Sequence, residues 1–462
     1  MRVQGAAFHV VVPDNGQAVV TSQHSTQSYA RTSYQLRARA GTITTKHGKT
    51  QTPTSLLPTS RGAIFYLTPD MFHSQNEGEG VAKSRYGLLH AAGAKVSIPQ
   101  LMNHSGFSSK KRPRDSDDTD LGEKIGLSSS AENVVSDVTC IDARSKLGHY
   151  PFPLVVATAR GCLLPDSNCD NVRKRSNEKA MSILTPSGSV YITPEEYIDL
   201  VESLGADLYA ALAEEVPSSK KALEASVDLS LSWLKTIAKE HENRKWPEDR
   251  LLMGVVIGGD NERDRRRCAK GVNDTDGIQG IVVGGIGVHV ETVTDVKNVI
   301  KWSLEGTKET YLRAAWGLRG PEEILDAINL GIDIFDGTYP LMMTQQDKAL
   351  CIPIWNKASE NDKENLEWQI NLDLSLKKYS RDAEPIVKGC QCYTCTRHSR
   401  AYIHHLINCR EMLSQTLLMI HNTHQVSLFF EDIRESIMDG RFENYHEWFL
   451  SLKTVDDKDF QT

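Results

Sequence analysis

Three cysteines within six positions are the residues of this sequence best suited to chemistry. Cys390, Cys392 and Cys395 precede a long helical pattern that we expect to end at Ile420-His421-Asn422. Three thiolates and one imidazole suit Zn²⁺, and a closed four-ligand site is usually structural. A thioredoxin-like pair of Cys392 and Cys395, or a chance cluster, would need no metal. A redox pair requires neither a third thiol nor a distant histidine, so the pattern favours one zinc ion per chain.

Spacing alone does not choose the fourth ligand. His421 lies far enough beyond Cys395 for a helix to carry the chain out and back. Other histidines in this part of the sequence compete with it, and they are His398, His404, His405 and His424.

An aspartate at the end of an apolar segment is the second residue with a chemical use. Asp336 follows Ile332-Asp333-Ile334-Phe335, which has the pattern of a buried strand. A carboxylate in such a place can serve in covalent catalysis. Spacing alone favours the simpler interpretation, in which the carboxylate only caps a neighbouring turn.

Alternating strand and helix patterns supply the frame that would position these residues. Thr193-Pro194-Glu195-Glu196 has the cap, proline and acids of a helix start. Short connections and apolar strands predict a parallel sheet covered by helices. The strand patterns fall at 206–210, 251–257, 280–283, 311–316 and 332–335, and helical patterns at 223–234, 293–304 and 321–330.

Two folds fit that alternation, a doubly wound sheet and a (β/α)8 barrel. No Gly-x-Gly-x-x-Gly opens a helix after the first strand, which counts against a dinucleotide-binding sheet. Gly258-Gly259 and Gly284-Gly285 follow two of the predicted strands. Such glycine pairs suit the loops at the C-terminal end of a barrel, where the active sites of that fold lie.

The remaining patterns divide the chain into four predicted parts. Residues 1–103 carry the turn signals of antiparallel hairpins and then the start of the barrel. Residues 104–181 form a polar insertion, disordered over roughly 106–135. Its basic run at 110–114 is interpreted as a solvated charge run, with a nuclear signal or phosphate-binding patch as the alternatives. Residues 182–350 complete the barrel, and residues 351–462 hold the zinc-binding module and C-terminal helices.

Composition narrows the class of protein. The net charge of −7 and isoelectric point near 6.1 argue against wrapping nucleic acid over most of the surface, although a local basic groove is compatible with them. Nine cysteines, an odd number with three clustered, indicate a reducing compartment and a metal rather than a disulfide framework. We expect no signal peptide and no membrane span, because the N-terminus lacks an apolar core and no apolar run is long enough.

The segment from Cys390 to Asn422 resembles the zinc-binding module of tRNA-guanine transglycosylases. It contains Ser399-Arg400-Ala401-Tyr402-Ile403-His404-His405-Leu406, and Leu417-Leu418-Met419-Ile420-His421-Asn422 matches the family's Leu-x-x-Ile-His-Asn. The resemblance implies His421 as the fourth zinc ligand. It also implies a TIM-type (β/α)8 barrel with an N-terminal antiparallel hairpin region and a zinc-binding insertion near the last strand. Members exchange guanine for queuine, or a precursor, at the wobble position of tRNAs with GUN anticodons.

The groups that perform this exchange are only partly present. Gly331-Ile332-Asp333-Ile334-Phe335-Asp336 is similar to the family's nucleophile motif, in which the aspartate matching Asp336 attacks the ribose carbon. A second carboxylate must protonate the leaving guanine. The family's Asp-Ser-Gly-Gly-Phe-Gln motif supplies it, and nothing similar occurs between Leu88 and Ile192.

The base-reading and anticodon-binding residues are also altered. Ala213 stands where the family has a base-binding aspartate, beside a matching Glu214, and an alanine cannot hydrogen-bond a purine edge. The family's glutamine is missing at the strand end near Ile257. In the next loop His289 adds bulk, and we interpret it as a packed or solvated histidine rather than a base. Pro340-Leu341-Met342 lacks the arginine that contacts the anticodon.

The sequence keeps the zinc ligands and the strand ends but lacks several catalytic groups. In this it resembles the accessory, non-catalytic members of the family. The resemblance implies a heterodimer with a catalytic queuine tRNA-ribosyltransferase subunit, with Leu406, Ile407 and Leu413 among the partner contacts. It implies contact with tRNA through that complex and no DNA partner, and a homodimer is the alternative assembly. It further implies a cytoplasmic location or a peripheral one on the mitochondrial outer membrane.

Two other hypotheses belong to different classes. The chain would be an enzyme in its own right if Asp336 served as nucleophile with an unrecognised general acid. A zinc-dependent nucleic-acid-binding scaffold unrelated to base exchange is the third hypothesis, and the acidic balance of charge counts against it.

Overall fold

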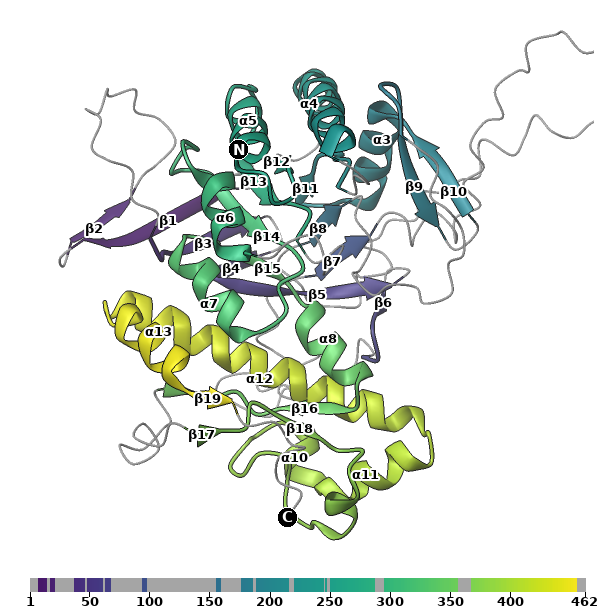
Figure 1. Ribbon diagram of the computed structural model, residues 1–462, viewed down its shortest axis with the longest axis vertical. Coiled ribbons are helices and arrows are strands. Elements are labelled where there is room, and N and C mark those ends of the chain that lie inside the picture. The colour runs from purple at the N-terminus through teal and green to yellow at the C-terminus, as the bar shows by residue number, and fades with distance from the viewer. Residues whose placement is uncertain are drawn as a thin grey trace, which may run out of the picture.

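The computed structural model of the chain describes residues 7–14, 17–20, 37–45, 48–60, 63–67, 94–97, 155–158, 176–185, 188–215, 220–244, 246, 250–286, 295–355 and 367–454. The predicted disordered segment, its basic run and His289 lie outside these residues. Figure 1 shows a parallel sheet with helices around it in the upper part of the view, and a smaller C-terminal module below.

Eight of the described strands form a closed parallel ring. The ring closes where Ile334, Phe335 and Asp336 pair with Thr54, Ser55 and Leu56. This confirms the predicted TIM-type (β/α)8 barrel. In spatial order the strands are β5 (Thr54–Ser60), β7 (Ala94–Ser97), β8 (Val155–Thr158), β11 (Leu208–Ala210), β12 (Leu251–Val256), β13 (Gly280–Val283), β14 (Leu312–Ala315) and β15 (Ile334–Asp336).

The strands of the ring have the composition that this fold requires. Every residue of β12 and β13 is buried, because the barrel interior covers one face and helices cover the other. One difference from the expected division of the chain is β8, a barrel strand that lies within the segment 104–181. The strand belongs to the apolar run Leu154-Val155-Val156-Ala157, which the prediction included in the polar insertion.

Helices follow the strands of the second half of the barrel in regular alternation. They are α4 (Lys220–Asn243), α5 (Glu262–Asn273), α6 (Val296–Leu304), α7 (Pro321–Asn329) and α8 (Thr338–Gln345). Before them, α3 (Pro194–Leu204) begins as predicted: the Thr193 hydroxyl accepts the Glu196 N–H, and the Glu196 carboxylate accepts the Thr193 N–H. It ends at Gly205, whose φ of 62° is a left-handed conformation that glycine adopts readily.

Antiparallel hairpins precede the barrel, as the turn signals predicted, and a further hairpin that was not predicted flanks it. The N-terminal sheet has the order β2-β1-β3-β4, and a second hairpin joins β9 and β10. The short β6 pairs antiparallel with the end of β5. The bounds are β1 (Ala7–Asp14), β2 (Gln17–Val20), β3 (Ala40–Thr45), β4 (Gly48–Thr52), β6 (Ala63–Ile64), β9 (Met181–Thr185) and β10 (Gly188–Ile192).

A buried ion pair joins the residue before β3 to the residue before β15. The Arg39 guanidinium lies 2.9 Å and 2.5 Å from the two carboxylate oxygens of Asp333, and both residues are buried. Arg39 also donates to the backbone carbonyls of Glu309 and Tyr311, while Asp333 accepts the Arg313 N–H. The pair therefore fixes the N-terminal sheet against the barrel, although its members are 294 positions apart.

The C-terminal module has its own small core beside the barrel. That core includes Leu374, Tyr379, Ile386 and Ile403. The elements from the end of the barrel onward are β16 (Lys348–Leu350), β17 (Glu367–Trp368), β18 (Asn371–Asp373), η3 (Lys377–Arg381), α10 (Tyr393–Arg397), α11 (Arg400–Asn408), α12 (Met412–Met438), α13 (Phe442–Ser451) and β19 (Lys453–Thr454).

One long helix, α12, belongs to both cores. The expectation that the helical run ends at Asn422 was wrong, because the helix continues to Met438. Leu417 and Leu418 pack in the module core, whereas Phe429 and Ile433 pack in the barrel core. The apolar face after Asn422 covers the barrel beside β5 and α8, and this contact extends the helix. No described helix, α12 included, is long and apolar enough to cross a membrane.

Candidate metal centre

The structure brings together the four residues predicted as ligands. The Nδ1 atom of His421 lies 3.9 Å, 3.5 Å and 3.3 Å from the sulfurs of Cys390, Cys392 and Cys395. All four potential ligand atoms lie within 4.8 Å of one another. His421 and Cys392 are fully buried, and Cys390 is half-buried. Among the histidine, cysteine, aspartate and glutamate side chains of the described residues, these four form the group that could hold a metal ion.

These distances fit a tetrahedral ion. Zinc–sulfur bonds of about 2.3 Å and zinc–nitrogen bonds of about 2.0 Å at tetrahedral angles place sulfur and nitrogen about 3.5 Å apart. The three observed separations span that value. Thiolate and imidazole are also the donor types that zinc prefers. The residues present therefore fit zinc, and all four tetrahedral positions would be taken by protein ligands, which is the arrangement of a structural site.

The short helix α10 and the turn before it place the three cysteines near the histidine. Cys392 is the N-cap of α10, and its sulfur accepts the N–H of Cys395 at 3.4 Å. The Cys395 thiol therefore lies one turn later on the same side. The hydroxyl of Thr394, buried between them, donates to the Leu417 carbonyl at 2.6 Å and so fixes α10 to α12. This contact holds the cysteine turn against the helix that carries His421.

Hydrogen bonds from neighbouring elements orient the ligands. The Nε2 atom of His421 lies 2.7 Å from the Leu350 carbonyl, so this nitrogen carries the proton and leaves Nδ1 for a metal. Gln425, one turn farther along α12, donates to the Cys390 sulfur at 3.5 Å. Sequence reasoning missed both Leu350 and Gln425. Gln425 stands four residues after His421, which is the spacing of neighbours on one helix face.

Adjacent to the ligand, Asn422 makes three buried hydrogen bonds. Its Oδ1 atom accepts the Leu350 N–H at 2.8 Å, and its Nδ2 atom donates to the Lys348 carbonyl and the Thr344 hydroxyl at 3.0 Å each. The His421-Asn422 pair therefore bonds to both ends of β16 and to α8. These bonds give Asn422 a structural role, because they hold the segment that carries the ligand against the barrel.

The cysteines and the histidine of the cluster shift one another's pKa values. Hydrogen bonds with Cys392 and Cys395 lower the pKa of the Cys390 thiol below its ordinary value. Burial lowers the pKa of His421, but hydrogen bonds and charge interactions with Cys390 and Cys395 outweigh burial and raise it to about 10. A metal ion would displace these shared protons, because thiolate and neutral imidazole are the forms that bind it.

The competing histidines have other contacts. His404 bonds to the Leu374 carbonyl and to Asn408 within the module core. His398 stacks on Tyr402 with ring centroids 5.0 Å apart. His405 is exposed, and its ring lies 3.8 Å from the Cys409 sulfur. His424, buried on α12, forms a side-chain hydrogen bond with Cys390 but is not one of the four residues whose ligand atoms come together. The geometry therefore agrees with His421 as the fourth ligand.

At the C-terminal end of the barrel, the Asp336 carboxylate accepts hydrogen bonds from neighbouring residues. It ends β15 and is 7% exposed. One carboxylate oxygen accepts the Gly317 N–H at 3.2 Å, and the other accepts the Thr338 hydroxyl at 2.9 Å. These are the contacts of a turn-capping aspartate, although the C-terminal end of β15 is also where barrel active sites form. The segments 159–175 and 287–294 lie outside the described residues.

Beyond β11 the structure places Ala213 and Glu214 in a tight connection. Ala213 is 4% exposed, and the Glu214 backbone N–H donates to the Ser230 hydroxyl. The next residue, Glu215, reaches the paired glycines, because its carboxylate accepts the Gly285 N–H at 2.9 Å. The resemblance had matched Glu214 to the family's glutamate, but the glutamate whose side chain contacts the glycine loop is Glu215.

A buried arginine ties together two strand ends beside these glycines. Arg265 of α5 donates to the carbonyls of Val256, Gly259 and Gly284. It was not predicted, since it lies in a charged helix start and three of its neighbours are also arginines. Its contacts keep the ends of β12 and β13 in register at the barrel mouth.

The fold and the site together define a class: a closed (β/α)8 barrel followed by a C-terminal module with a Cys₃His cluster. The chain belongs to the queuine tRNA-ribosyltransferase family, whose model matches residues 156–454. That range includes five of the eight barrel strands in full, most of β8, and all four cluster residues.

Individual relatives of two kinds are similar to the chain. A queuine tRNA-ribosyltransferase accessory subunit 2 of Anopheles gambiae is 30% identical over 285 residues, which cover 60% of this chain and 65% of that protein. One from Aedes aegypti is 28% identical over 282 residues, covering 59% and 66%. A queuine tRNA-ribosyltransferase of Thermus thermophilus is 31% identical over 262 residues, covering 56% and 62%. The matched part of the chain spans less than two thirds of each relative.

Proposed function

We propose that this chain is the non-catalytic subunit of a heterodimeric tRNA-guanine transglycosylase. In this proposal a catalytic homologue exchanges guanine for queuine at the wobble position of tRNAs with GUN anticodons. The chain supports that exchange by assembling with the catalytic subunit, and tRNA is bound through the complex. The relatives named accessory subunit 2 support this assignment.

The side chain at position 213 supports the proposal most directly. Ala213 lies buried in the connection after β11, and its side chain is a methyl group that can neither donate nor accept a hydrogen bond. A site that selects guanine needs donors and acceptors facing the purine edge, and it loses discrimination without them. The scaffold elements, the closed barrel and the Cys₃His cluster, are all present. Their presence fits a role in assembly that does not need base recognition.

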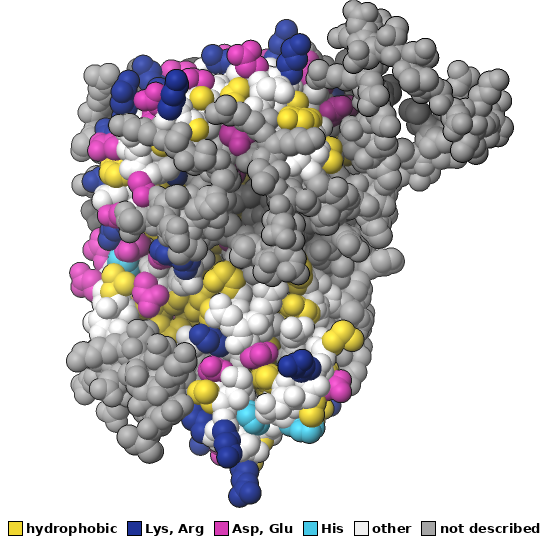
Figure 2. All heavy atoms as spheres, turned by 45° about the vertical axis from the view of Figure 1, so that its right-hand side comes forward, with side chains coloured by type: hydrophobic (Ala, Val, Ile, Leu, Met, Phe, Trp, Pro, Cys, Tyr) yellow, Lys and Arg dark blue, Asp and Glu magenta, His cyan; other side chains and the backbone are white. Residues whose placement is uncertain are grey.

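An exposed apolar surface on the metal module suits a partner subunit. We define this module surface as Met412, Leu413 and Tyr402, which are 82%, 44% and 38% exposed. They lie at the start of α12 and on the adjoining α11, and Figure 2 shows hydrophobic and histidine side chains side by side on this part of the molecule. Leu406, an expected partner contact, is buried in the module core and is not available to a partner. Leu413 remains, and Ile407 is half-buried.

Two further features complete the proposal. One structural zinc ion per chain would hold the module in the form that presents this surface. The complex would act in the cytoplasm, with a peripheral position on the mitochondrial outer membrane as the alternative. A homodimer that buries the same surface is the alternative assembly.

Reconstitution from purified chains tests the function. The chain, its catalytic homologue and an equimolar mixture would each receive guanylated tRNA and labelled queuine. We expect co-elution of the two chains in size-exclusion chromatography and incorporation only when the catalytic homologue is present. Incorporation by this chain alone, or separate elution of the two chains at micromolar concentration, would contradict the proposal.

An active enzyme is the second candidate, and the position of Asp336 favours it. Its carboxylate lies at the C-terminal end of β15, where barrel active sites form. A covalent adduct with tRNA would separate this candidate from the first, because only a nucleophile forms one. Asp336→Asn would abolish trapping on this chain if the second candidate holds. If the adduct never forms on this chain with any tRNA, the second candidate fails.

A further inference from the structure

The outer end of the metal module carries more positive than negative charge. Residues 374–400 contain six lysines and arginines but two acids, whereas the whole chain contains 53 and 60. Figure 2 shows Lys and Arg side chains protruding at this lower end of the molecule. We define the basic surface as four exposed cations of the segment, which are Lys377, Arg381, Lys388 and Arg397.

Packing within the module brings these four cations together. Two of them lie at the ends of η3, a five-residue helix that packs against α11. Arg400, at the start of α11, joins η3 to the segment before Lys388. Its guanidinium lies 6.0 Å from the Tyr379 ring of η3, and it donates to the Ile386 carbonyl at 2.8 Å. Arg397 stands three positions before Arg400, in α10. Three neighbouring segments therefore build the basic surface.

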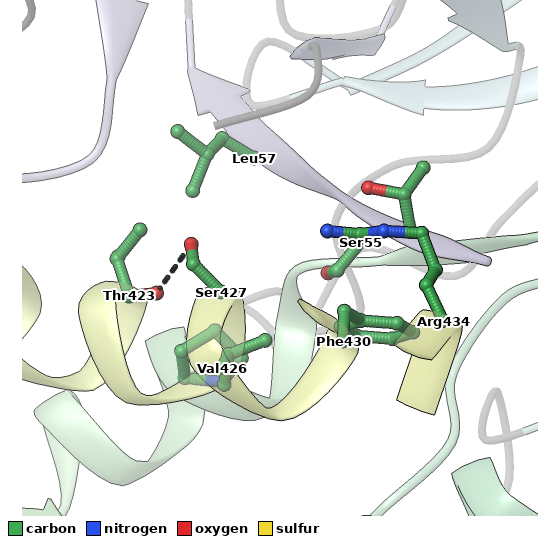
Figure 3. A pocket seen from close by; sticks show the side chains of 9 residues that line it. Ser55, Leu57, Thr423, Val426, Ser427, Phe430 and Arg434 are labelled. Carbon is green, nitrogen blue, oxygen red and sulfur yellow. Dashed lines mark hydrogen bonds between the residues drawn. The ribbon is translucent and has the colours of Figure 1, made fainter. Parts of the chain in front are cut away.

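Acids of the chain leave this charge in place. Arg400 pairs with Asp382 at 3.0 Å, which engages one of the two acids, and the other is the exposed Glu384. Among the described residues, the four cations of the basic surface take no part in an ion pair. Arg434 of α12 differs from them, because it lies in a pocket beside β5 and donates to the Pro53 carbonyl at 2.9 Å (Figure 3).

The composition of the basic surface favours a phosphate backbone over a lipid surface. Lysine and arginine are the side chains that contact the phosphates of nucleic acids. A surface that enters the membrane interface needs exposed apolar side chains beside its cations. The large, exposed hydrophobic side chains of the described residues include none from residues 374–400.

We propose that the basic surface binds the phosphate backbone of the tRNA, so that this chain contacts the RNA directly. The identity of the RNA rests on the proposed function. Tyr402 of the module surface stacks on His398, and His398 follows Arg397 directly. The basic surface therefore adjoins the proposed contact with the catalytic subunit. A tRNA held by that subunit can continue from there onto this chain.

Fluorescence anisotropy with a labelled tRNA that has a GUN anticodon tests this inference. The full, metal-loaded chain is titrated alone and in an equimolar mixture with the catalytic homologue, at several salt concentrations. We expect the chain alone to bind the tRNA, with an affinity that falls as salt rises, because cations on a phosphate backbone release its counter-ions.

Charge reversal connects that binding to the basic surface. Lys377→Glu, Arg381→Glu and Lys388→Glu together should weaken tRNA binding at least about tenfold. The slope of log affinity against log salt should also become shallower by about 2–3. Lys377→Glu alone lies on exposed η3, outside the metal cluster, and should make the slope shallower by about 1 even if the triple variant does not fold.

A matched control separates the basic surface from the net charge. Lys270→Glu, Lys301→Glu and Lys308→Glu change the net charge by the same amount at exposed positions of the barrel. Distant charges are screened by salt, so this variant should change tRNA affinity less than about threefold. Co-elution with the catalytic homologue is measured for both variants and should be retained.

Three results would overturn the inference. They are the absence of tRNA binding by the chain alone, equal losses in the two triple variants, and unaltered tRNA affinity in the basic-surface variant. Vesicles of anionic phospholipid are a parallel probe, and loss of vesicle binding with unaltered tRNA affinity would assign the surface to a membrane. Failure of the unaltered chains to co-elute contradicts the proposed function alone, because tRNA binding by this chain is measured separately.

Discussion

The Nε2 atom of His421 lies 2.7 Å from the carbonyl oxygen of Leu350, which joins the metal cluster to the strand that leaves the barrel. This bond fixes the ring so that Nδ1 faces the three sulfurs. Leu350 ends β16, and β16 follows α8 of the barrel directly. The orientation of the His421 ring therefore depends on the position of β16, which follows directly from α8 of the barrel.

Replacing one buried sulfur should release the metal. Cys392→Ser removes a fully buried thiolate, and we expect the loss of about one zinc ion per chain and unfolding of the module at lower temperature. Elemental analysis and thermal unfolding measure the two effects. Cys409→Ser, an exposed cysteine on the same module, is the control and should keep its metal. Full zinc content in the Cys392 variant would refute the ligand assignment.

Removing the asparagine beside the ligand should destabilise the fold. Asn422→Ala breaks three buried hydrogen bonds and leaves the Leu350 N–H and Lys348 carbonyl without their partner. We expect a loss of about 2–4 kcal/mol in the free energy of unfolding. Chemical denaturation measures it, with Gln391→Ala, an exposed residue between two ligands, as the control. Equal stabilities of the two variants would show that these bonds contribute little.

The buried ion pair below the barrel should be sensitive to the loss of one partner. Asp333→Asn leaves the Arg39 guanidinium buried without its counter-ion, which costs about 3–5 kcal/mol. Asp199→Asn breaks an ion pair with Arg244 near the surface, and the cost there is about 0–1 kcal/mol. Denaturant midpoints of the two variants compare the sites. A difference of less than about 1 kcal/mol would contradict the structural role assigned to Arg39.

A charge on the module surface should weaken assembly. Leu413→Asp places a carboxylate at the proposed contact with the catalytic subunit, where an unpaired charge would be desolvated, so affinity should fall at least about tenfold. Leu450→Asp alters an equally exposed leucine on α13 and should leave affinity unchanged. Biolayer interferometry with the catalytic homologue separates them. Similar affinities for the two variants would place the interface elsewhere.

Much of the barrel and the cluster can be predicted from local sequence. Strands such as 251–256 and 280–283 are apolar throughout, and α3 has a complete capping box, so short-range chemistry decides these elements. The three cysteines lie within six positions, and one family motif supplies the histidine. These features need no knowledge of distant contacts.

Distant contacts decide the rest. Barrel closure depends on the pairing of β15 with β5, and the Arg39–Asp333 pair spans most of the chain. The extension of α12 beyond Asn422 follows from contacts of Phe430 and Ile433 with the barrel core, which no local pattern reveals. Gln425 was missed for the same reason, since only the assembled helix shows that it faces a sulfur.

Residues of α12 belong to both the barrel core and the module core. We therefore expect metal binding and the stability of the barrel to depend on each other. A mutation that removes a thiol would loosen the same helix that covers β5 and α8. Selection could therefore let the second carboxylate and the base-reading groups change, while substitutions at the cysteines would be removed as folding defects. In such a lineage, metal content would report on folding and would say nothing about turnover.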